Sequence, residues 1–204
     1  MQNRMKYDQI LDAFQKLLVN KNMKTISVSE IAQTAGIGKG SIYYYFPSKE
    51  AILDALIERS YKRPLETARQ LTEQTDISPF TRMALIFQSC RDSSRELMHP
   101  DKIDIQSDIR EHAFLHHKYL THLISGLKPP LTEIIRQGIT GGQIHFEHPA
   151  ALAEIVLIVL TVKLDNTLVP SSQAEVENTI LGLIELLEKG TDNPKGSLNF
   201  LKIL

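Results

Sequence analysis

The sequence contains one cysteine, Cys90, among its 204 residues. A single thiol cannot form an internal disulfide framework, and so little cysteine is typical of proteins from a reducing cytosol. A lone cysteine is more often a small buried hydrophobic side chain than a redox sensor. The first ten residues, MQNRMKYDQI, also lack the long apolar stretch of a signal peptide, so we expect a cytoplasmic protein.

Sequence motifs of catalysis are missing as well. The chain has no G-x-S-x-G nucleophile elbow, no phosphate-binding glycine loop and no specific base paired with Cys90. The spacing Gly36-x-Gly38-x-Gly40 is rich in glycine, but it follows a predicted helix rather than a strand, which argues against a dinucleotide site. We therefore predict a protein that is not an enzyme and needs no cofactor.

The longest apolar run, AALAEIVLIVLTVKL at residues 150–164, is too short to cross a membrane. A membrane-spanning helix needs about 20 apolar residues, whereas this run also contains Glu154 and Lys163. We expect no membrane partner. Because the run is apolar nearly all round, it indicates a helix that is buried on most sides.

The net charge of −1 is low for a protein that binds nucleic acid, but the charge is unevenly distributed. Residues 1–63 hold ten Lys or Arg and six Asp or Glu, a net charge of +4, and the remainder holds 13 and 18, a net charge of −5. A basic N-terminal part places the attraction for phosphate at one end of the chain. The excess is small and supports such an interpretation only together with a motif.

Apolar residues spaced three and four apart predict helices throughout, with no lasting strand pattern and no internal repeat. We therefore expect an all-α fold of about nine helices. Pro64 predicts a kink or helix end, with a hinge between two units near residues 64–76, and Gly126 with Pro129-Pro130 predicts a break or bend in another helix. Outside the motif described below, we expect helices at about residues 4–20, 79–94, 101–114 and 116–139, the last of these ended by Gly141-Gly142. Three more are expected: one opened by Pro47 and Ser48, one starting at Pro149, and a last one from Ser172 to about 189. The tail that follows is expected either to be loosely ordered or to dock through Leu198, Phe200 and Leu201.

Residues 28–49, VSEIAQTAGIGKGSIYYYFPSK, predict a helix, a tight turn and a second short helix. Ser27 and Glu30 have the spacing of a capping box at the start of the first helix. Gly36 stands where the chain reverses, a place that favours a left-handed backbone conformation. Three consecutive tyrosines on the second helix are hard to explain as core, whereas a helix laid in the DNA major groove would use them.

The run GIGKGSIYYYFPSKEAIL resembles the signature of the TetR family of transcriptional regulators, whose pattern is close to G-V-S-K-G-T-L-Y-x-Y-F-x-x-K-E-x-L. The resemblance covers roughly residues 5–56. Gly38 departs from it, since the family usually carries Ser or Thr there; a glycine cap costs only a few tenths of a kcal/mol relative to serine. The resemblance implies a three-helix helix-turn-helix DNA-binding domain at 1–63 and a helical effector-binding and dimerisation domain at 64–204.

On this interpretation the second helix and its flanks contact double-stranded DNA. Lys39 is expected to reach a phosphate or a guanine edge, Gly40 to allow close backbone approach, and Tyr43 to contact base edges. Phosphate contacts are expected from Ser41, Tyr44, Thr25 and Ser27, and from Lys49 in the first turn of the following helix. Tyr45 and Phe46 are expected to pack beneath the motif. The alternative for Lys39 and Lys49 is solvated surface charge.

The resemblance also implies a small-molecule effector pocket within residues 78–140. Apolar side chains with a few polar partners suit such a pocket, although as core residues they need no ligand. The predicted pocket residues are Phe87, Cys90, Ile109, His112, Phe114 and His116.

His112 and His116 also share one helix face, with His117 and His122 nearby, and imidazole binds zinc, copper or nickel. No cysteine stands beside them and no H-E-x-x-H motif is present. We predict histidines that face solvent or line the pocket, and no metal.

A second copy of the chain is the expected partner of the apolar C-terminal helices. Two helices from each of two chains would close a four-helix bundle, which the family resemblance also implies; the alternative is that both helices pack inside one monomer. The predicted interface residues are Ile155, Leu157, Ile158, Val162, Ile180, Leu183, Ile184 and Leu187.

The sequence thus predicts a homodimeric transcriptional repressor that binds a palindromic operator and is released by an unidentified small-molecule effector. Two alternatives keep the DNA-binding unit and change the other half. In one, the C-terminal half docks a protein partner, and in the other it senses a metal.

Overall fold

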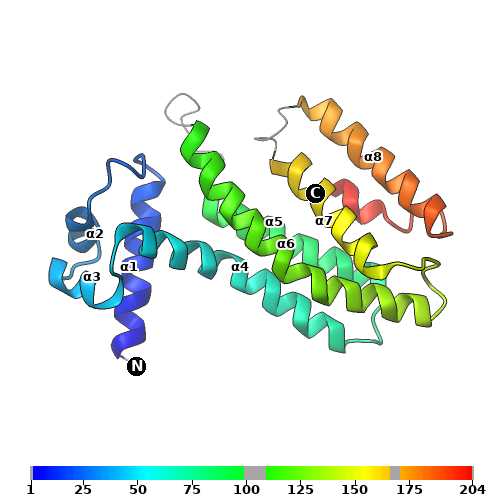
Figure 1. The fold of residues 1–204 in the computed structure, drawn as a ribbon, viewed down its shortest axis with the longest axis horizontal. Helices are drawn as coiled ribbons and strands as arrows, with labels where there is room; N and C mark the ends of the chain where they lie inside the picture. Colours follow the sequence, from blue (N-terminus) through cyan, green and yellow to red (C-terminus); the bar gives the residue numbers. More distant parts are fainter. Residues whose placement is uncertain (1, 99–108, 166–170, 204) are drawn as a thin grey trace. The chain divides into compact units, whose positions relative to one another are not determined.

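The computed structural model describes residues 2–98, 109–165 and 171–203, with the side chains of 2–4, 94–98, 109–116, 164–165 and 203 left out of the description (Figure 1). Every regular element in these ranges is helical, which confirms the all-α prediction. The α-helices are α1 (Gln2–Leu18), α2 (Val28–Thr34), α3 (Lys39–Tyr45), α4 (Lys49–Glu73), α5 (Pro79–Met98), α6 (Ile109–Thr140), α7 (Pro149–Asp165) and α8 (Gln173–Gly190), followed by the 3-10 helix η2 (Asn199–Ile203).

The chain divides into two compact units, each described by itself below. Unit 1 contains residues 1–60 and 94–115, and unit 2 contains 61–93 and 116–204. The N-terminal element of unit 2 is the second half of α4, which continues without interruption past residue 63.

The prolines within helices do not act as the sequence analysis expected. Pro64 neither ends α4 nor forms a helical boundary; it is buried inside a helix that continues to Glu73. Pro129 and Pro130 likewise lie inside the single helix α6, so the helix is not broken there, and the alternative of a bend stays a prediction. A proline inside a helix removes one backbone hydrogen bond, and here the packing of long apolar helix faces outweighs that loss.

Gly126 belongs to the same long helix and has a packing role instead of a breaking one. A Cβ atom at Gly126 would lie 2.7 Å from Cδ2 of Leu65 on α4. The glycine therefore lets the leucine side chain of α4 approach the backbone of α6. The predicted helix over 101–114 lies partly outside the described residues, and its last part belongs to α6.

Unit 1 is built on a core in which α1, α2, α3 and the first half of α4 meet. Phe14, Ile31, Ile42 and Leu56 are each at most 1% exposed and come from these four helices. The Arg59 guanidinium on α4 donates to Asp12 Oδ1 at 2.6 Å and to Gln15 Oε1 at 2.8 Å, both on α1. Hydrophobic burial and this polar clamp together fix α4 against α1.

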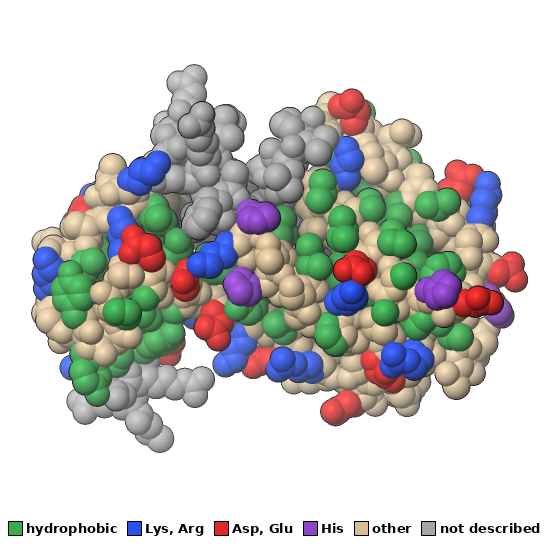
Figure 2. All heavy atoms as spheres, viewed as in Figure 1, with side chains coloured by type: hydrophobic (Ala, Val, Ile, Leu, Met, Phe, Trp, Pro, Cys, Tyr) green, Lys and Arg blue, Asp and Glu red, His purple; other side chains and the backbone are tan. Residues whose placement is uncertain are grey.

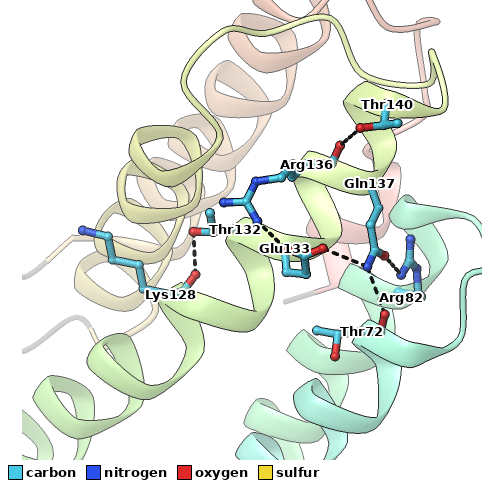
Figure 3. Close-up of polar contacts among 8 residues, drawn as sticks. All are labelled: Thr72, Arg82, Lys128, Thr132, Glu133, Arg136, Gln137 and Thr140. Atoms are coloured by element: carbon cyan, nitrogen blue, oxygen red, sulfur yellow. Dashed lines mark hydrogen bonds and ion pairs between the residues drawn. The ribbon is translucent and has the colours of Figure 1, made fainter.

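In unit 2 a polar cluster joins the end of α4 to α5 and α6 (Figure 3). The buried Arg82 of α5 donates to the carbonyl of Leu71 at 3.2 Å and to Gln137 Oε1 at 2.6 Å. Gln137 of α6 donates in turn to the carbonyl of Thr72 at 3.1 Å and to Glu133 Oε1 at 3.1 Å. The last carbonyls of α4 thus receive side-chain donors, which a helix C-terminus requires, and the cation suits the negative end of the helix dipole.

The C-terminal tail docks onto the rest of unit 2. Of the two alternatives that the sequence left open, a loosely ordered tail and a docked tail, the structure shows the second. Leu198 is 6% exposed and Leu201 is 1% exposed, and η2 packs against α8. No helix in the described ranges combines the length and the apolar character that a membrane crossing requires.

Candidate nucleic-acid interface

The first helix of the motif begins at a complete capping box, as its sequence predicted. The Ser27 hydroxyl accepts from the backbone N–H of Glu30 at 3.2 Å, and the Glu30 carboxylate accepts from the backbone N–H of Ser27 at 2.8 Å. Lys21 donates to the same carboxylate at 2.7 Å. These hydrogen bonds lower the pKa of Glu30 to about 2, the Lys21 bond being the largest cause. The start of α2 is therefore held by an ionised carboxylate at neutral pH.

The turn between α2 and α3 depends on the backbone of Gly36. Its φ of 68° lies in the left-handed region that glycine adopts without strain. The next helix starts at Gly38, which has an extended backbone and offers no side-chain cap. The missing cap is the departure from the family pattern that the sequence showed, and α3 forms without it.

Helix α3 divides into a buried side and an exposed side. Ile42 is 1% exposed and anchors the helix, while Phe46, just after its end, is 4% exposed and stacks on Tyr7 with ring centroids 4.8 Å apart. On the opposite side Tyr43 is 51% exposed and Tyr44 is 74% exposed. The hydrophobic effect favours the burial of aromatic rings of this size. The fold nevertheless leaves these two tyrosines exposed to solvent.

The other predicted DNA-contact residues on α3 and before α2 are accessible. Lys39 and Gly40 are exposed, and Ser41 is half-buried. A Cβ at Gly40 would meet nothing within 4 Å, so the backbone is open there. Thr25 and Ser27 are exposed, although the Thr25 hydroxyl donates to the carbonyl of Asn22 at 2.8 Å. We give the name tyrosine surface to these accessible positions together: Thr25, Ser27, Lys39, Gly40, Ser41, Tyr43 and Tyr44.

Lys49 lies in the first turn of α4, as predicted, and its contact with phosphate stays a prediction. Its ammonium donates to the carbonyls of Met23 at 2.8 Å and of Ile26 at 2.9 Å, and its side chain is partly buried. Two of its three N–H groups are therefore used to tie the loop before α2 to the start of α4. The sequence missed this role because it depends on two carbonyls more than 20 residues away.

Unit 2 contains a partly open apolar cavity of about 40 Å³ between helices α5, α6, α7, α8 and the C-terminal tail. Phe87, a predicted pocket residue, lines it, together with Phe80 and Met83 of the same helix. Leu198, Phe200 and Leu201 close it from the tail. The side chains of the predicted pocket residues Ile109, His112, Phe114 and His116 lie outside the described residues.

Cys90 does not line this cavity, which corrects its predicted position. Burial raises the pKa of its thiol to about 12. Burial also raises the pKa of Tyr119, with proximity to Cys90 as the second cause. The nucleophilic form of cysteine is the thiolate, so at neutral pH the half-buried Cys90 stays in its unreactive thiol form.

Helices α7 and α8 pack on each other and present a further apolar surface (Figures 1 and 2). Ile155 and Ile158 of α7 and Leu181 and Leu186 of α8 are exposed. We call these four residues the aliphatic surface. Of the predicted interface residues, Ile155 and Ile158 lie on it and Val162 is half-buried.

Four of the remaining predicted interface residues lie inside the protomer, which corrects their expected location, and the fifth, Leu187, is half-buried. Leu157, Ile180, Leu183 and Ile184 are buried in unit 2. Leu187 lines the apolar cavity. Their helical spacing marks a buried face correctly, but that face packs within one chain.

The histidines of α6 give no described metal site. Among the described side chains, no three His, Cys, Asp or Glu residues lie close enough together to hold a metal ion. His117 is exposed, and the His122 ring stacks on Tyr61 with centroids 5.4 Å apart. His112 and His116 lie outside the described side chains.

Comparison with known proteins agrees with this geometry. Residues 10–56 match the sequence profile of the family described as bacterial regulatory proteins, tetR family. The transcriptional regulator EthR of Mycolicibacterium smegmatis is 48% identical over 54 residues, which cover 26% of this chain and 25% of that protein. The chain thus matches only about a quarter of the length of that relative.

Two further comparisons cover more of the chain. The fatty acid metabolism regulator protein of Bacillus subtilis is 28% identical over 143 residues, covering 70% of this chain and 73% of that protein. The crystal structure of the transcriptional regulator FadR from Bacillus subtilis, solved in complex with stearoyl-CoA, is 22% identical, has a TM-score of 0.62 and covers 90% of this chain and 98% of that one. The profile match over residues 10–56 shows that this chain carries the helix-turn-helix domain of the tetR family of bacterial regulatory proteins, and the solved structure shows that the fold is shared beyond that domain.

Proposed function

We propose that this chain is a transcriptional repressor that binds a palindromic operator as a homodimer and leaves it when a small-molecule effector binds within residues 64–204. The observation that carries the proposal is the tyrosine surface. Two large side chains with polar tips, Tyr43 and Tyr44, are held in solvent by a short helix whose other side is anchored in the core. A helix of this kind, presented by a helix-turn-helix, fits the major groove.

The tyrosine surface supplies the groups that a DNA duplex requires. Tyr43 contacts base edges or a thymine methyl, and Lys39, Ser41 and Tyr44 contact phosphate. Gly40 lets the α3 backbone approach the groove. Thr25 and Ser27 add phosphate contacts at the loop and at the start of α2.

The aliphatic surface supports the homodimer. Exposed aliphatic side chains on two neighbouring helices are typical of a contact site, and two antiparallel helices from each chain close a four-helix bundle. A two-fold dimer places two copies of α3 about 34 Å apart, or a multiple of that, on one face of the duplex. A palindromic operator follows from that symmetry.

The cavity of unit 2 supports a small-molecule effector over the alternative of a docked protein, because it is a small concave site lined mostly by apolar side chains. The structure of FadR contains stearoyl-CoA. Here the cavity is far smaller than a long acyl chain needs, so we expect a smaller effector or a wall that moves. Effector binding must favour a dimer whose α3 helices no longer match the groove, since only differential affinity shifts the equilibrium.

The test is operator binding by fluorescence anisotropy, with a duplex selected from a random pool by the purified protein. Tyr43→Ala should weaken binding by about 1–3 kcal/mol, roughly five- to 150-fold, because base contacts are lost. Leu85→Ala, which removes a side chain of similar exposure on α5, is the matched control. Unchanged affinity for Tyr43→Ala, or equal losses for both variants, contradicts the proposal.

A further inference from the structure

The apolar cavity of unit 2 has one polar feature in its wall, at the end of α8. Asp192 has a φ of 51°, and the backbone N–H of Asn193 donates to the carbonyl of Glu188 at 2.9 Å. This left-handed turn ends the helix and reverses the chain. It places Asn193 in the lining of the cavity.

The hydrogen bonds around Asn193 identify which end of its side-chain amide is the nitrogen and which is the oxygen. The Thr191 hydroxyl donates its single proton to the carbonyl of Leu187 at 2.7 Å. It can therefore only accept from Asn193, whose Nδ2 lies 2.7 Å away. The other atom of the amide must be the oxygen Oδ1, a hydrogen-bond acceptor.

This acceptor is buried, and no described residue donates to it. A buried polar group without a partner costs free energy, and such groups in folded proteins need an explanation. In a cavity whose other walls are mostly apolar, the group that would satisfy Asn193 Oδ1 is a single N–H or O–H on an otherwise apolar molecule.

The cavity is too small for such a molecule unless part of its wall moves. An engineered apolar cavity of about 150 Å³ holds benzene, whereas this one measures about 40 Å³. Three of its lining side chains, Leu198, Phe200 and Leu201, belong to the C-terminal tail. The tail is held to α8 by Glu188, which accepts from the backbone N–H of Gly196 at 2.8 Å and of Leu198 at 3.1 Å.

We infer that the cavity binds a small apolar molecule carrying one hydrogen-bond donor, which bonds Asn193 Oδ1 and moves the Leu198–Leu201 tail outward. Phenols and short alcohols have this chemistry. The inference rests on the effector role proposed above for unit 2 and names the class of ligand. The tail fills, in the free protein, part of the space that the ligand takes.

Two probes of nearly equal shape test the donor. p-Cresol has one hydroxyl, and p-xylene has a methyl group in its place, so both need the same space. We expect p-cresol to bind roughly tenfold more tightly, because only its hydroxyl satisfies the acceptor. Affinities come from calorimetry, and the methyl NMR signal of Met83 in the cavity, compared with that of the exposed Met5, reports where the probe binds.

Asn193→Leu should abolish the preference for p-cresol and leave p-xylene binding within about twofold, while Asn199→Leu, an exposed amide on the tail, should change neither. The amide of Leu198 should exchange with solvent faster when p-cresol is bound, since its bond to Glu188 breaks. Equal affinities for the two probes, a preference that survives Asn193→Leu, no shift at Met83, or slower exchange at Leu198 overturns the inference.

These measurements contain no DNA, so they fail or succeed independently of the proposed function. Release of the operator by p-cresol is measured separately by anisotropy. Specific binding of p-cresol without release would contradict the effector role and leave the ligand class intact. Release of the operator without any preference for the donor would contradict the ligand class alone.

Discussion

The tyrosine surface and the aliphatic surface both expose large apolar side chains, but the chemistry of their tips differs. Tyr43 and Tyr44 end in hydroxyls that can donate and accept. Ile155, Ile158 and Leu181 end in methyl groups. Tyrosine side chains can contact a hydrated, charged duplex, whereas aliphatic side chains pack favourably only against another apolar surface.

The two surfaces also differ in how the chain supports them. The tyrosine surface stands on a helix of seven residues with one buried side chain, Ile42, and no side-chain cap, so it depends on the capping box of the neighbouring α2 and on the Lys49 tie. The aliphatic surface belongs to two helices of 17 and 18 residues whose other faces form the core of unit 2. Small changes near α3 should therefore alter the first surface, whereas the second should respond only to changes in its own side chains.

The largest effect is expected from a charge on the aliphatic surface. Ile158→Glu should convert a dimer into a monomer, because an unpaired carboxylate buried in an interface costs about 3 kcal/mol or more. Folding of the monomer should be little changed, since the side chain is 46% exposed. Sedimentation velocity checks the mass and circular dichroism the fold.

Leu85→Glu is the matched control, since Leu85 is also 46% exposed but lies on α5. It should remain a dimer. If Ile158→Glu sediments like the unchanged protein, the aliphatic surface is not the interface.

The next largest effect is expected beneath the tyrosine surface. Lys49→Met keeps the side-chain length but removes the ammonium that binds the carbonyls of Met23 and Ile26. Hydrogen bonds to charged groups contribute about 1.5–3 kcal/mol, so we expect a loss of about 2 kcal/mol in the free energy of unfolding.

Urea denaturation measures this loss, and Lys62→Met, an exposed lysine on the same helix, serves as control. A phosphate clamp without structural role predicts the opposite pattern. In that case Lys49→Met would weaken operator binding and leave the midpoint of unfolding where it was.

A smaller effect is expected from Lys39. If this exposed lysine contacts a phosphate, Lys39→Ala should weaken binding of all duplexes alike and reduce the slope of log K against log salt by about 1. Lys195→Ala changes the net charge equally but lies in the tail after α8, so its slope should stay the same. Equal slopes for the two variants would assign Lys39 to solvated surface charge.

The smallest effect is the pH dependence of the α2 cap. The pKa of Glu30 is lowered from 4.5 to about 2 in the folded chain, so its contribution is complete above about pH 4.5 and is lost as the pH falls toward 2. Glu30→Gln should melt at a lower temperature than the unchanged protein at pH 7, and the difference should vanish near pH 2.

Calorimetric melting between pH 2 and 7 checks this, and Glu147→Gln, which changes an exposed carboxylate between α6 and α7, should show no such trend. A difference in melting temperature that stays constant across this range would mean that the charge of Glu30 does not hold the cap.

Local signals predicted the helix-turn-helix well. The capping box at Ser27, the left-handed turn at Gly36 and the burial of Ile42 and Phe46 depend on neighbours within a few residues. The exposure of Tyr43 and Tyr44 followed from the same spacing. The role of each exposed residue toward DNA stays a prediction.

Signals that depend on distant residues were misread. Pro64 and Pro129-Pro130 have a strong local preference against helix interiors, yet burial of long apolar faces keeps α4 and α6 continuous. Gly126 gave no sign that Leu65 packs against it. Periodicity also placed Leu157 on an apolar face without showing whether that face meets the same chain or another.

The order of residues alone determined that this protein is helical, where its short motif begins and turns, and which tyrosines face outward, because capping, turn geometry and helical period act over a few positions. Only the tertiary structure decided what Lys49 binds, which aliphatic side chains stay exposed, and that Asn193 meets an apolar cavity closed by the tail. Those outcomes depend on which segments, far apart in the chain, exclude water from each other, and burial between distant segments is not written in any local pattern.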